Sequence, residues 1–243
     1  MDLKKHEQIE TYIRGEIEEG ILVPGDQIPT ELELAEQFKT SRPTVRQALE
    51  LLRMEGYLVR RKGKGTFVSR PKQKHESTSF VSGYKKECEK KNQQLITRVI
   101  SMRTEKADDE VAHKLGLVPG QKVVCLTRLR KIRSSVAGAR EKPVLYTTVY
   151  VPYQSFEFIL NVDFEQKSFY ETLEEHGKKV THASRCLEVC APEQEIRNAL
   201  QLGAFEPAIF ISSVGKTALE ETVEYSVSYY PASNSQFLIE VDK

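Results

Sequence analysis

Two short amphipathic segments separated by only two residues constrain the N-terminal part of this chain most strongly. Thr30 and Glu33 have the spacing of a capping box, in which each side chain accepts a hydrogen bond from the other residue's amide. Ser41 has the character of a second N-cap, and Pro43 suits a first helical turn, where amides lack intrahelical partners. The pattern predicts two helices joined by a tight turn, and an ordinary helical hairpin is the alternative.

The second predicted helix has an apolar side and a basic side. An exposed arginine can donate two hydrogen bonds to guanine, and the free amides at a helix start favour phosphate. Such a helix fits the major groove of DNA in width and in chemistry. The apolar positions are Val45, Ala48, Leu49 and Leu52, and the basic positions are Arg42, Arg46 and Arg53.

A third helix and a hairpin flank this pair. Apolar residues from Ile9 to Ile17 recur at helical spacing before Gly20, which can end a helix in the left-handed conformation. Two strand-like runs, residues 57–61 and 66–68, surround the cationic tip Lys62-Gly63-Lys64-Gly65 and predict a β-hairpin wing. Small residues allow such a tip to enter a minor groove. A nucleotide-binding loop is the alternative, but the Walker pattern is missing.

The distribution of charge supports a nucleic-acid partner, although the net charge of +1 does not. Residues 1–38 hold three basic and ten acidic side chains, whereas residues 39–75 hold eleven basic and two acidic ones. The remaining residues hold 22 basic and 23 acidic side chains. The basic surplus therefore coincides with the second helix and the wing, which favours DNA binding over a merely solvated charge run.

Length and composition limit the class of protein. A chain of 243 residues forms one or two domains, and 39% hydrophobic with 29% charged residues excludes collagen-like, mucin-like and wholly disordered chains. No apolar run approaches the roughly 20 residues of a membrane span, and no secretory signal is visible. Four cysteines without C-x-x-C pairs fit a reduced cytoplasm, so we expect a cytoplasmic protein without membrane contact.

The N-terminal motifs resemble the DNA-binding domain of GntR-family bacterial transcription regulators. The resemblance covers about 65 residues in order and spacing, and it implies a winged helix-turn-helix. It also implies that the helix beginning after Ser41 meets the major groove and that the wing tip reads the minor groove. The motifs are Ile28-Pro29-Thr30-Glu31, Ser41-Arg42-Pro43-Thr44-Val45-Arg46 and Lys62-Gly63-Lys64-Gly65-Thr66-Phe67-Val68.

The DNA-binding residues that this resemblance implies lie at both helix starts and at the wing tip. They are Thr30, Ser41, Arg42, Thr44, Arg46, Lys62, Gly63, Lys64 and Gly65. The family often carries an arginine between the two glutamates of the helix that Thr30 caps, whereas this chain has Leu32 at that position. A contact at that position therefore does not carry over.

The C-terminal part reads as an α+β domain after a polar linker at residues 69–79. Strands and helices alternate, and the pattern predicts a mostly antiparallel sheet. The expected strands are residues 96–103, 122–131, 144–151, 183–189, 208–214, 222–230 and 237–241, and the expected helices are residues 83–91, 108–115, 169–176 and 192–200.

An internal repeat occurs at an offset of 85 residues. A short helix, a turn and an apolar strand around Glu110 and Val123 recur around Glu195 and Ala208. The repeat predicts a pseudo-two-fold domain with a central cleft, and chance similarity over few positions is the alternative.

Strand alternation places polar groups on common faces. Arg128 and Arg130 share one face of their strand, and Glu224 and Tyr230 share the polar face of another. Such a face is either exposed to solvent or suited to a small anionic or hydroxylated ligand, because guanidiniums bind phosphate or carboxylate and a carboxylate binds hydroxyls.

A second resemblance rests on the segments Ala107…Leu115-Gly116-Leu117…Gly120, Thr127-Arg128-Leu129-Arg130, Val149-Tyr150-Val151-Pro152, Ser168-Phe169-Tyr170 and Glu224-Tyr225-Ser226…Tyr230. They resemble the effector domain of the HutC-type branch of the GntR family, the UTRA domain. That domain has the chorismate-lyase fold but senses ligands, which are phosphorylated sugars or amino sugars in some members. Tyr146 stands where relatives often have Glu, and residues 133–142 are longer than the expected turn, so ligand identity does not carry over. The implied pocket residues are Ser79, Phe80, Arg128, Arg130, Ser168, Glu224 and Tyr230.

No motif predicts a catalytic, cofactor or metal site. Cys186 and Cys190 on one strand have no nearby His and make a poor metal clamp. No G-x-S-x-G, H-E-x-x-H or Cys/His pair stands out. We therefore expect no enzyme, although a small-acid lyase tethered to DNA, with Glu224 as acid or base, is the alternative.

Together these features predict a metabolite-responsive repressor. We expect a DNA-binding domain at residues 1–70, a linker at residues 71–78, and an effector-binding and dimerisation domain at residues 79–243. A homodimer would read a palindromic operator in double-stranded DNA, and a small anionic metabolite would release it. A constitutive architectural DNA-binding protein is a third possibility. The operator and the effector do not follow from the sequence.

Overall fold

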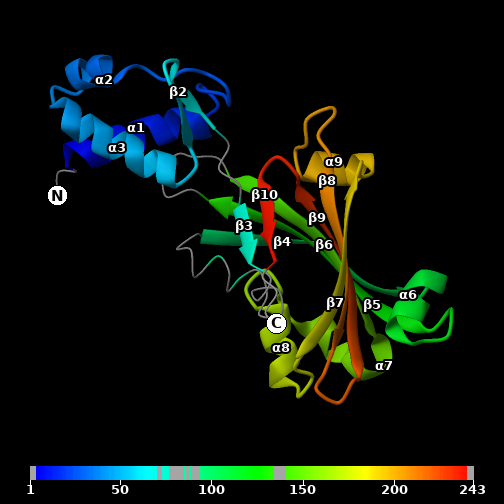
Figure 1. Cartoon of the computed structure of the whole chain (residues 1–243). Coiled ribbons are helices and arrows are strands. Elements are labelled where there is room, and N and C mark those ends of the chain that lie inside the picture. Colours follow the sequence, from blue (N-terminus) through cyan, green and yellow to red (C-terminus); the bar gives the residue numbers. More distant parts are fainter. Residues whose placement is uncertain are drawn as a thin grey trace. The chain divides into compact units, whose positions relative to one another are not determined.

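The computed structural model describes residues 4–69, 73–76, 85, 88, 94–133 and 141–239. These residues fall into two compact units, one up to Gln73 and one from Lys74 onwards (Figure 1). No helix of the described residues combines the length and the apolar character that crossing a membrane requires.

The N-terminal unit has three helices and a hairpin, as the sequence predicted. Strands β1 and β2 pair antiparallel from Leu58↔Val68 to Arg61↔Gly65, and an isolated bridge joins Gln27 to Phe67. The elements are α1 (Lys5–Glu18), α2 (Glu31–Gln37), α3 (Arg42–Met54), β1 (Leu58–Arg61) and β2 (Gly65–Val68).

Local capping fixes where α2 and α3 begin. The Thr30 hydroxyl accepts from the Glu33 amide, and the Glu33 carboxylate accepts from the Thr30 amide at 2.7 Å. At α3 the Ser41 hydroxyl accepts from the Thr44 amide. Lys39 takes a left-handed φ of 48° in the turn between the two helices, a conformation that costs an L-residue about 1 kcal/mol. The tight turn is thus held by caps on both sides.

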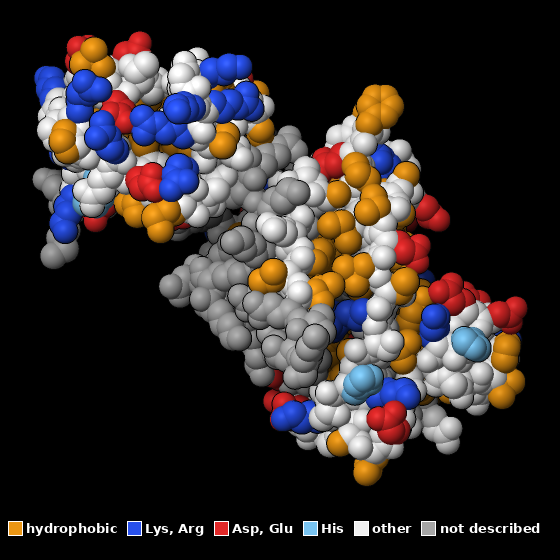
Figure 2. Space-filling view, in the orientation of Figure 1, with side chains coloured by type: hydrophobic (Ala, Val, Ile, Leu, Met, Phe, Trp, Pro, Cys, Tyr) orange, Lys and Arg blue, Asp and Glu red, His pale blue; other side chains and the backbone are white. Residues whose placement is uncertain are grey.

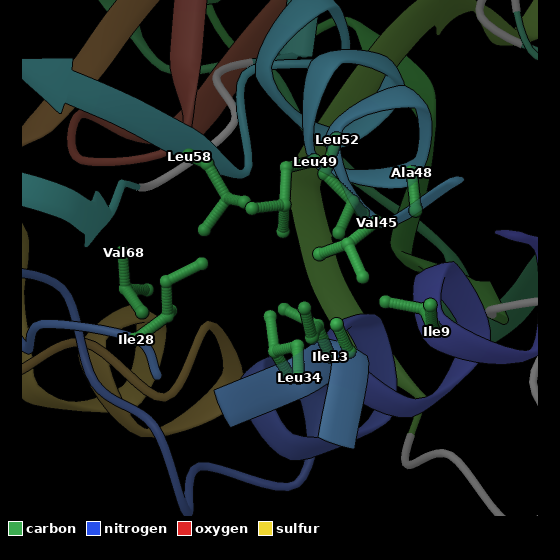
Figure 3. Close-up of a cluster of buried hydrophobic side chains, with 11 residues drawn as sticks. Ile9, Ile13, Ile28, Leu34, Val45, Ala48, Leu49, Leu52, Leu58 and Val68 are labelled. Atoms are coloured by element: carbon green, nitrogen blue, oxygen red, sulfur yellow. The ribbon is translucent and has the colours of Figure 1, made fainter. Parts of the chain in front are cut away.

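One apolar cluster holds the three helices and the hairpin together (Figure 3). Side chains from α1, α2 and α3 point toward one another and toward the base of the hairpin. Full burial of such a side chain contributes about 1.5–3 kcal/mol, so this cluster is what orients α3 on α2. The labelled members are Ile9, Ile13, Ile28, Leu34, Val45, Ala48, Leu49, Leu52, Leu58 and Val68.

A six-stranded antiparallel sheet forms the C-terminal unit, which confirms the α+β prediction. Its strand order is β4-β5-β6-β9-β8-β7. The strands are β4 (Gln94–Lys106), β5 (Lys122–Arg133), β6 (Lys142–Pro152), β7 (His182–Cys190), β8 (Ala208–Lys216) and β9 (Thr222–Pro231).

Helices cover both faces of this sheet. Helix α6 (Asp109–Leu115) packs against Tyr225, and helix α9 (Gln194–Ala199) packs against Tyr146 on the same face of the sheet. The opposite face carries Leu126 and Val149 and packs on α7 (Tyr153–Phe156), the 3-10 helix η1 (Glu157–Asn161) and α8 (Phe169–Glu175). The strand periodicity therefore separates two cores. We did not predict α7 and η1.

A second, two-stranded sheet corrects the linker prediction. Within the segment expected to be linker, Gln73–Glu76 forms strand β3, which pairs with β10 (Ser235–Leu238). The ring of His75 is buried, with ring centroids 4.6 Å from Phe237 and 4.9 Å from Tyr230. The residues around His75 in the sequence are polar, so the sequence alone did not reveal this inward-facing ring. Of the helix expected at residues 83–91, only Lys85 and Cys88 lie in the described residues, and both are helical.

Strand registers support the internal repeat, with the offset of 85 kept in the first two strands of each half and shortened by six residues in the third. Thr127 pairs with Ser101 and Thr148, and Ser212, 85 positions later, pairs with Cys186 and Val227. Each half thus runs strand, helix, strand, strand, and the halves meet where Thr148 pairs with Val227. The strands β6 and β9 pair directly at this axis, so the central cleft that we expected is not formed there by the described strands.

Two tyrosine–glutamate contacts obey the same symmetry. The Tyr225 hydroxyl donates to Glu110 of α6 at 2.7 Å. Tyr146 hydrogen-bonds Glu195 of α9, the residue 85 positions after Glu110. Each helix is therefore pinned to a strand of the other half.

We predict that Tyr225→Phe and Tyr146→Phe destabilise the C-terminal unit similarly, because each removes one hydrogen bond to a carboxylate. The expected cost is about 1 kcal/mol, which lowers Tm by about 2–4 °C in scanning calorimetry of the full chain. Tyr229→Phe is the control, because the Tyr229 hydroxyl has no hydrogen bond to a described residue. It only lies within range of charged groups such as Glu193. Equal Tm values for all three variants would contradict the symmetric pinning.

Candidate DNA-binding surface and effector cavity

The N-terminal half of α3 presents cations to solvent. The side chains of Arg42 and Arg46 are each 61% exposed, and Figure 2 shows Lys and Arg side chains gathered on the visible face of this unit. The Thr44 hydroxyl lies 2.9 Å from that of Ser41, so the two share the helix start. Ser41 is the N-cap of α3, which carries the arginines, and Thr30 is the N-cap of α2.

The wing tip is an exposed turn between β1 and β2. Gly63 and Gly65 adopt φ values of +72° and +116°, which L-residues rarely adopt, and Lys62 and Lys64 are exposed. A Cβ on Gly65 would also lie 2.5 Å from Nε2 of Gln27. The two glycines are thus needed for the turn and for its close approach to the preceding loop.

Sequence reasoning missed one member of the basic surface, Glu31. Its carboxylate accepts from Arg46 Nε at 3.3 Å and from Arg46 Nη2 at 2.8 Å, and it lies 3.8 Å from Arg42 Nη2. The Arg46 guanidinium lowers the pKa of the Glu31 carboxyl below its ordinary value. Leu32, the departure from the family pattern, is exposed beside it. An acid in the first turn of a helix is common because it favours the helix dipole, so its position alone did not mark this contact.

The C-terminal unit has a cavity of about 210 Å³ on the face of the sheet that α8 covers. Arg128 and Arg130 of β5 both line it, as strand alternation predicted, together with Thr97 of β4. The start of α8 supplies the opposite wall, where Ser168 lines the cavity and also caps the helix. The remaining lining residues are Lys85, Cys88, Leu95, Phe164, Glu165, Gln166, Lys167, Phe169 and Tyr170.

Arg128 is a buried cation, with only 3% of its surface exposed. Its guanidinium carbon lies 5.4 Å and 5.8 Å from the ring centroids of Phe169 and Phe164, and its Nε has no hydrogen-bond partner among the described residues. Burial lowers its pKa well below the ordinary value, and the neighbouring Arg130 adds to the effect. A buried, incompletely satisfied guanidinium beside a second one is a strong attractor for an anion.

Glu224 lies behind the cavity wall. Tyr170, which lines the cavity, donates a short hydrogen bond to Glu224 Oε1, and Oε2 has no partner among the described residues. Burial raises the pKa of the Glu224 carboxyl. In the register of β8 with β9 this residue stands opposite Gly215, where an added Cβ would lie 2.8 Å from Glu224 Cγ. Gly215 therefore leaves the space that the Glu224 side chain occupies.

The remaining predicted pocket residues are not brought to the cavity by the described structure. Tyr230 packs against His75 and Phe237 instead. Ser79 and Phe80 lie outside the described residues. Among the residues that we missed, Tyr170 was within the quoted family motif, whereas nothing local marked Gly215.

No group of three or more His, Cys, Asp or Glu side chains within the described ranges is arranged to hold a metal ion. Cys186 is exposed and Cys190 half-buried, and both are free thiols.

Comparisons with known proteins agree with both units. Residues 5–68 match the family described as "Bacterial regulatory proteins, gntR family", and residues 90–235 match the UTRA domain. The HTH-type transcriptional repressor NagR of Bacillus subtilis is 28% identical over 237 residues, covering 97% of this chain and 94% of NagR. The HTH-type transcriptional regulator YurK of the same organism is 29% identical over 233 residues, covering 96% and 93%.

A solved structure shares the fold over nearly the whole chain. The crystal structure of PhnF from Mycobacterium smegmatis has a TM-score of 0.73 at 22% identity, covering 98% of this chain and 99% of that one. The matched families and relatives are regulators and not enzymes, so the lyase alternative is set aside. The chain is a DNA-binding transcription regulator that belongs to the GntR family, with a C-terminal UTRA domain.

Proposed function

We propose that this regulator is a repressor, released from its operator by a small anionic metabolite that binds beside Arg128 and Arg130. The observation that carries the proposal is the buried Arg128 guanidinium, open on one side to a cavity of about 210 Å³. A phosphate or carboxylate would supply the acceptors that Arg128 Nε lacks among the described residues. The repressor activity of NagR, a relative by sequence, is consistent with this direction of control.

The polar groups of Tyr170 and Glu224 narrow the chemical class of the ligand. Tyr170 and Glu224 can exchange their mutual hydrogen bond for hydroxyl or amine groups of a ligand, because a carboxylate is an acceptor and a phenol is both donor and acceptor. A ligand such as a sugar phosphate would bind the two arginines through its anionic end and Tyr170 and Glu224 through its hydroxylated end. Ser168, at the start of α8, adds a hydroxyl to the lining of the cavity.

DNA recognition in this proposal uses the surface of α3 and the wing. Arg42, Thr44 and Arg46 would read the major groove, with Lys62 and Lys64 beside the minor groove. Thr30, Ser41, Gly63 and Gly65 would position these contacts, and two such surfaces in a cytoplasmic homodimer would read a palindrome. Domains at residues 1–70 and 79–243 would be coupled through residues 71–78, which include β3. The effector must then bind the DNA-free arrangement more tightly.

Arg46→Ala should abolish specific DNA binding without unfolding the protein, because the side chain is exposed and each bidentate base contact contributes about 1–3 kcal/mol. The probe is the duplex that the wild-type full chain selects from a random pool, and affinity is measured by fluorescence anisotropy. Arg53→Ala is the matched control, since Arg53 is exposed on the same helix and also ion-paired. Unchanged affinity of Arg46→Ala for the selected duplex would remove α3 as the reading helix.

Arg128→Ala and Arg130→Ala should leave DNA binding intact and block the response to effector. Sugar phosphates, amino-sugar phosphates and small carboxylates are first screened for compounds that raise the wild-type Tm, because a ligand at 100 times its Kd stabilises by about 2.7 kcal/mol. Both variants should lose that shift. The control is Arg133→Ala on the same strand, whose guanidinium pairs with Glu141 at 2.7 Å. A normal shift in both cavity variants would refute the pocket.

Gly215→Ala should weaken the same thermal shift while retaining affinity for the selected duplex, because the new methyl group displaces Glu224. Gly203→Ala controls for the glycine change itself, since a Cβ there meets its nearest atom, Glu206 Oε2, at an ordinary 3.7 Å. If both variants respond to ligand like the wild type, Glu224 takes no part in effector binding.

A further inference from the structure

A single carboxylate joins the starts of the two helices of the reading surface. Glu31 is the first residue of α2 and Arg46 lies in the second turn of α3, yet two hydrogen bonds join them, and the shorter, at 2.8 Å, is also an ion pair. The Glu31 side chain is only 17% exposed, whereas that of Arg46 is 61% exposed. The acid is thus anchored at the protein surface, and the guanidinium projects beyond it.

The geometry of the contact leaves the far edge of the guanidinium free. Glu31 occupies the side of Arg46 that carries Nε and one N–H of Nη2. The end of the fork, with N–H groups on Nη1 and Nη2, makes no hydrogen bond with a described residue and points away from the acid, because the guanidinium is planar. That end has the donor spacing that guanine O6 and N7 accept.

The anchor itself is rigid. Helix α2 begins at a complete capping box on Thr30 and Glu33, and its Leu34 and Ala35 are buried in the core of the unit. An arginine side chain carries about 2 kcal/mol of rotamer entropy, and a fixed carboxylate removes part of that freedom before DNA arrives. The position of Glu31 therefore sets the plane in which the Arg46 guanidinium lies.

We infer that Glu31 is a positioning residue for sequence readout, which orients Arg46 for a guanine contact and holds Arg42 nearby at 3.8 Å. The inference rests on the proposed role of Arg46 in DNA recognition. Glu31 does not contact the base in this scheme. It acts through the arginine, and its own negative charge faces the same polyanion that the arginines attract.

That charge separates a positioning role from a merely structural ion pair. Loss of a carboxylate at a DNA surface raises affinity for any duplex, because a repulsion with phosphates disappears. Loss of a positioning residue lowers discrimination at the base that Arg46 reads. Glu31→Gln should therefore bind non-selected DNA more tightly and yet distinguish sequences less well, whereas a structural pair would weaken all DNA binding in proportion to lost folding.

The experiment compares the wild type, Glu31→Gln and Glu36→Gln on the selected duplex and on single-base-pair variants of it. Glu36 is an exposed acid on the same helix, and its carboxylate makes no ion pair with a described residue. Glu36→Gln therefore controls for the lost charge. We expect Glu31→Gln to lose about tenfold discrimination at one G·C pair per half-site, the pair at which Arg46→Ala also loses it. Discrimination at the other positions should be retained.

A double-mutant cycle completes the test. In an Arg46→Ala background, Glu31→Gln should no longer change discrimination, since the group that it orients is gone. A Glu31→Gln profile identical to wild type, or a uniform loss at every position with a lowered Tm, would overturn the inference. If the wild-type chain selects no duplex at all, the proposed reading surface fails instead, so the two failures are distinguishable.

Discussion

The pairing of β6 with β9 is the constraint on which the C-terminal unit depends, because among the described strands this pairing alone joins the two similar halves into a single sheet. The repeat places Arg130 and Gly215 at equivalent positions, opposite Leu145 and Glu224. One half therefore contributes cations and the other contributes an acid with the space to hold it. A symmetric scaffold thus carries an asymmetric set of polar groups, as a ligand with two chemically different ends requires.

Buried charge is the feature of this unit that supports the proposed binding of an anionic ligand. Arg128 and Glu224 are both buried. Burial lowers the pKa of the Arg128 guanidinium and raises the pKa of the Glu224 carboxyl, so it disfavours the charged form of each. Burial is unfavourable for either charge without hydrogen-bond partners, and a ligand that completed their hydrogen bonds would offset that cost. The N-terminal unit uses charge differently. Its arginines are exposed and held in position by a carboxylate, so they remain available to a polyanion.

Much of the N-terminal unit was predictable because its signals are local. Capping residues, a short turn and helical apolar spacing specified α2 and α3 and the hairpin without knowledge of distant contacts. In the C-terminal unit, the alternation of side chains along β5 predicted that Arg128 and Arg130 share a face of the sheet. It did not predict which elements cover that face. Tyr230 shows the limit. It shares a face of β9 with Glu224, but six residues of strand span about 20 Å, so one small cavity does not include both. The single inward ring of His75 in β3 was likewise invisible within a polar segment.

The close approach of Gly215 to Glu224 has a consequence for how this domain can diversify. A side chain at Gly215 would meet the Glu224 side chain, so the glycine cannot be replaced without strain while the acid is retained. Substitutions at the glycine and at the acid are therefore coupled steps, and a sensor that exchanges the acid for a smaller residue gains room at the glycine. The order of the two exchanges therefore matters, because replacement of the acid must come before replacement of the glycine.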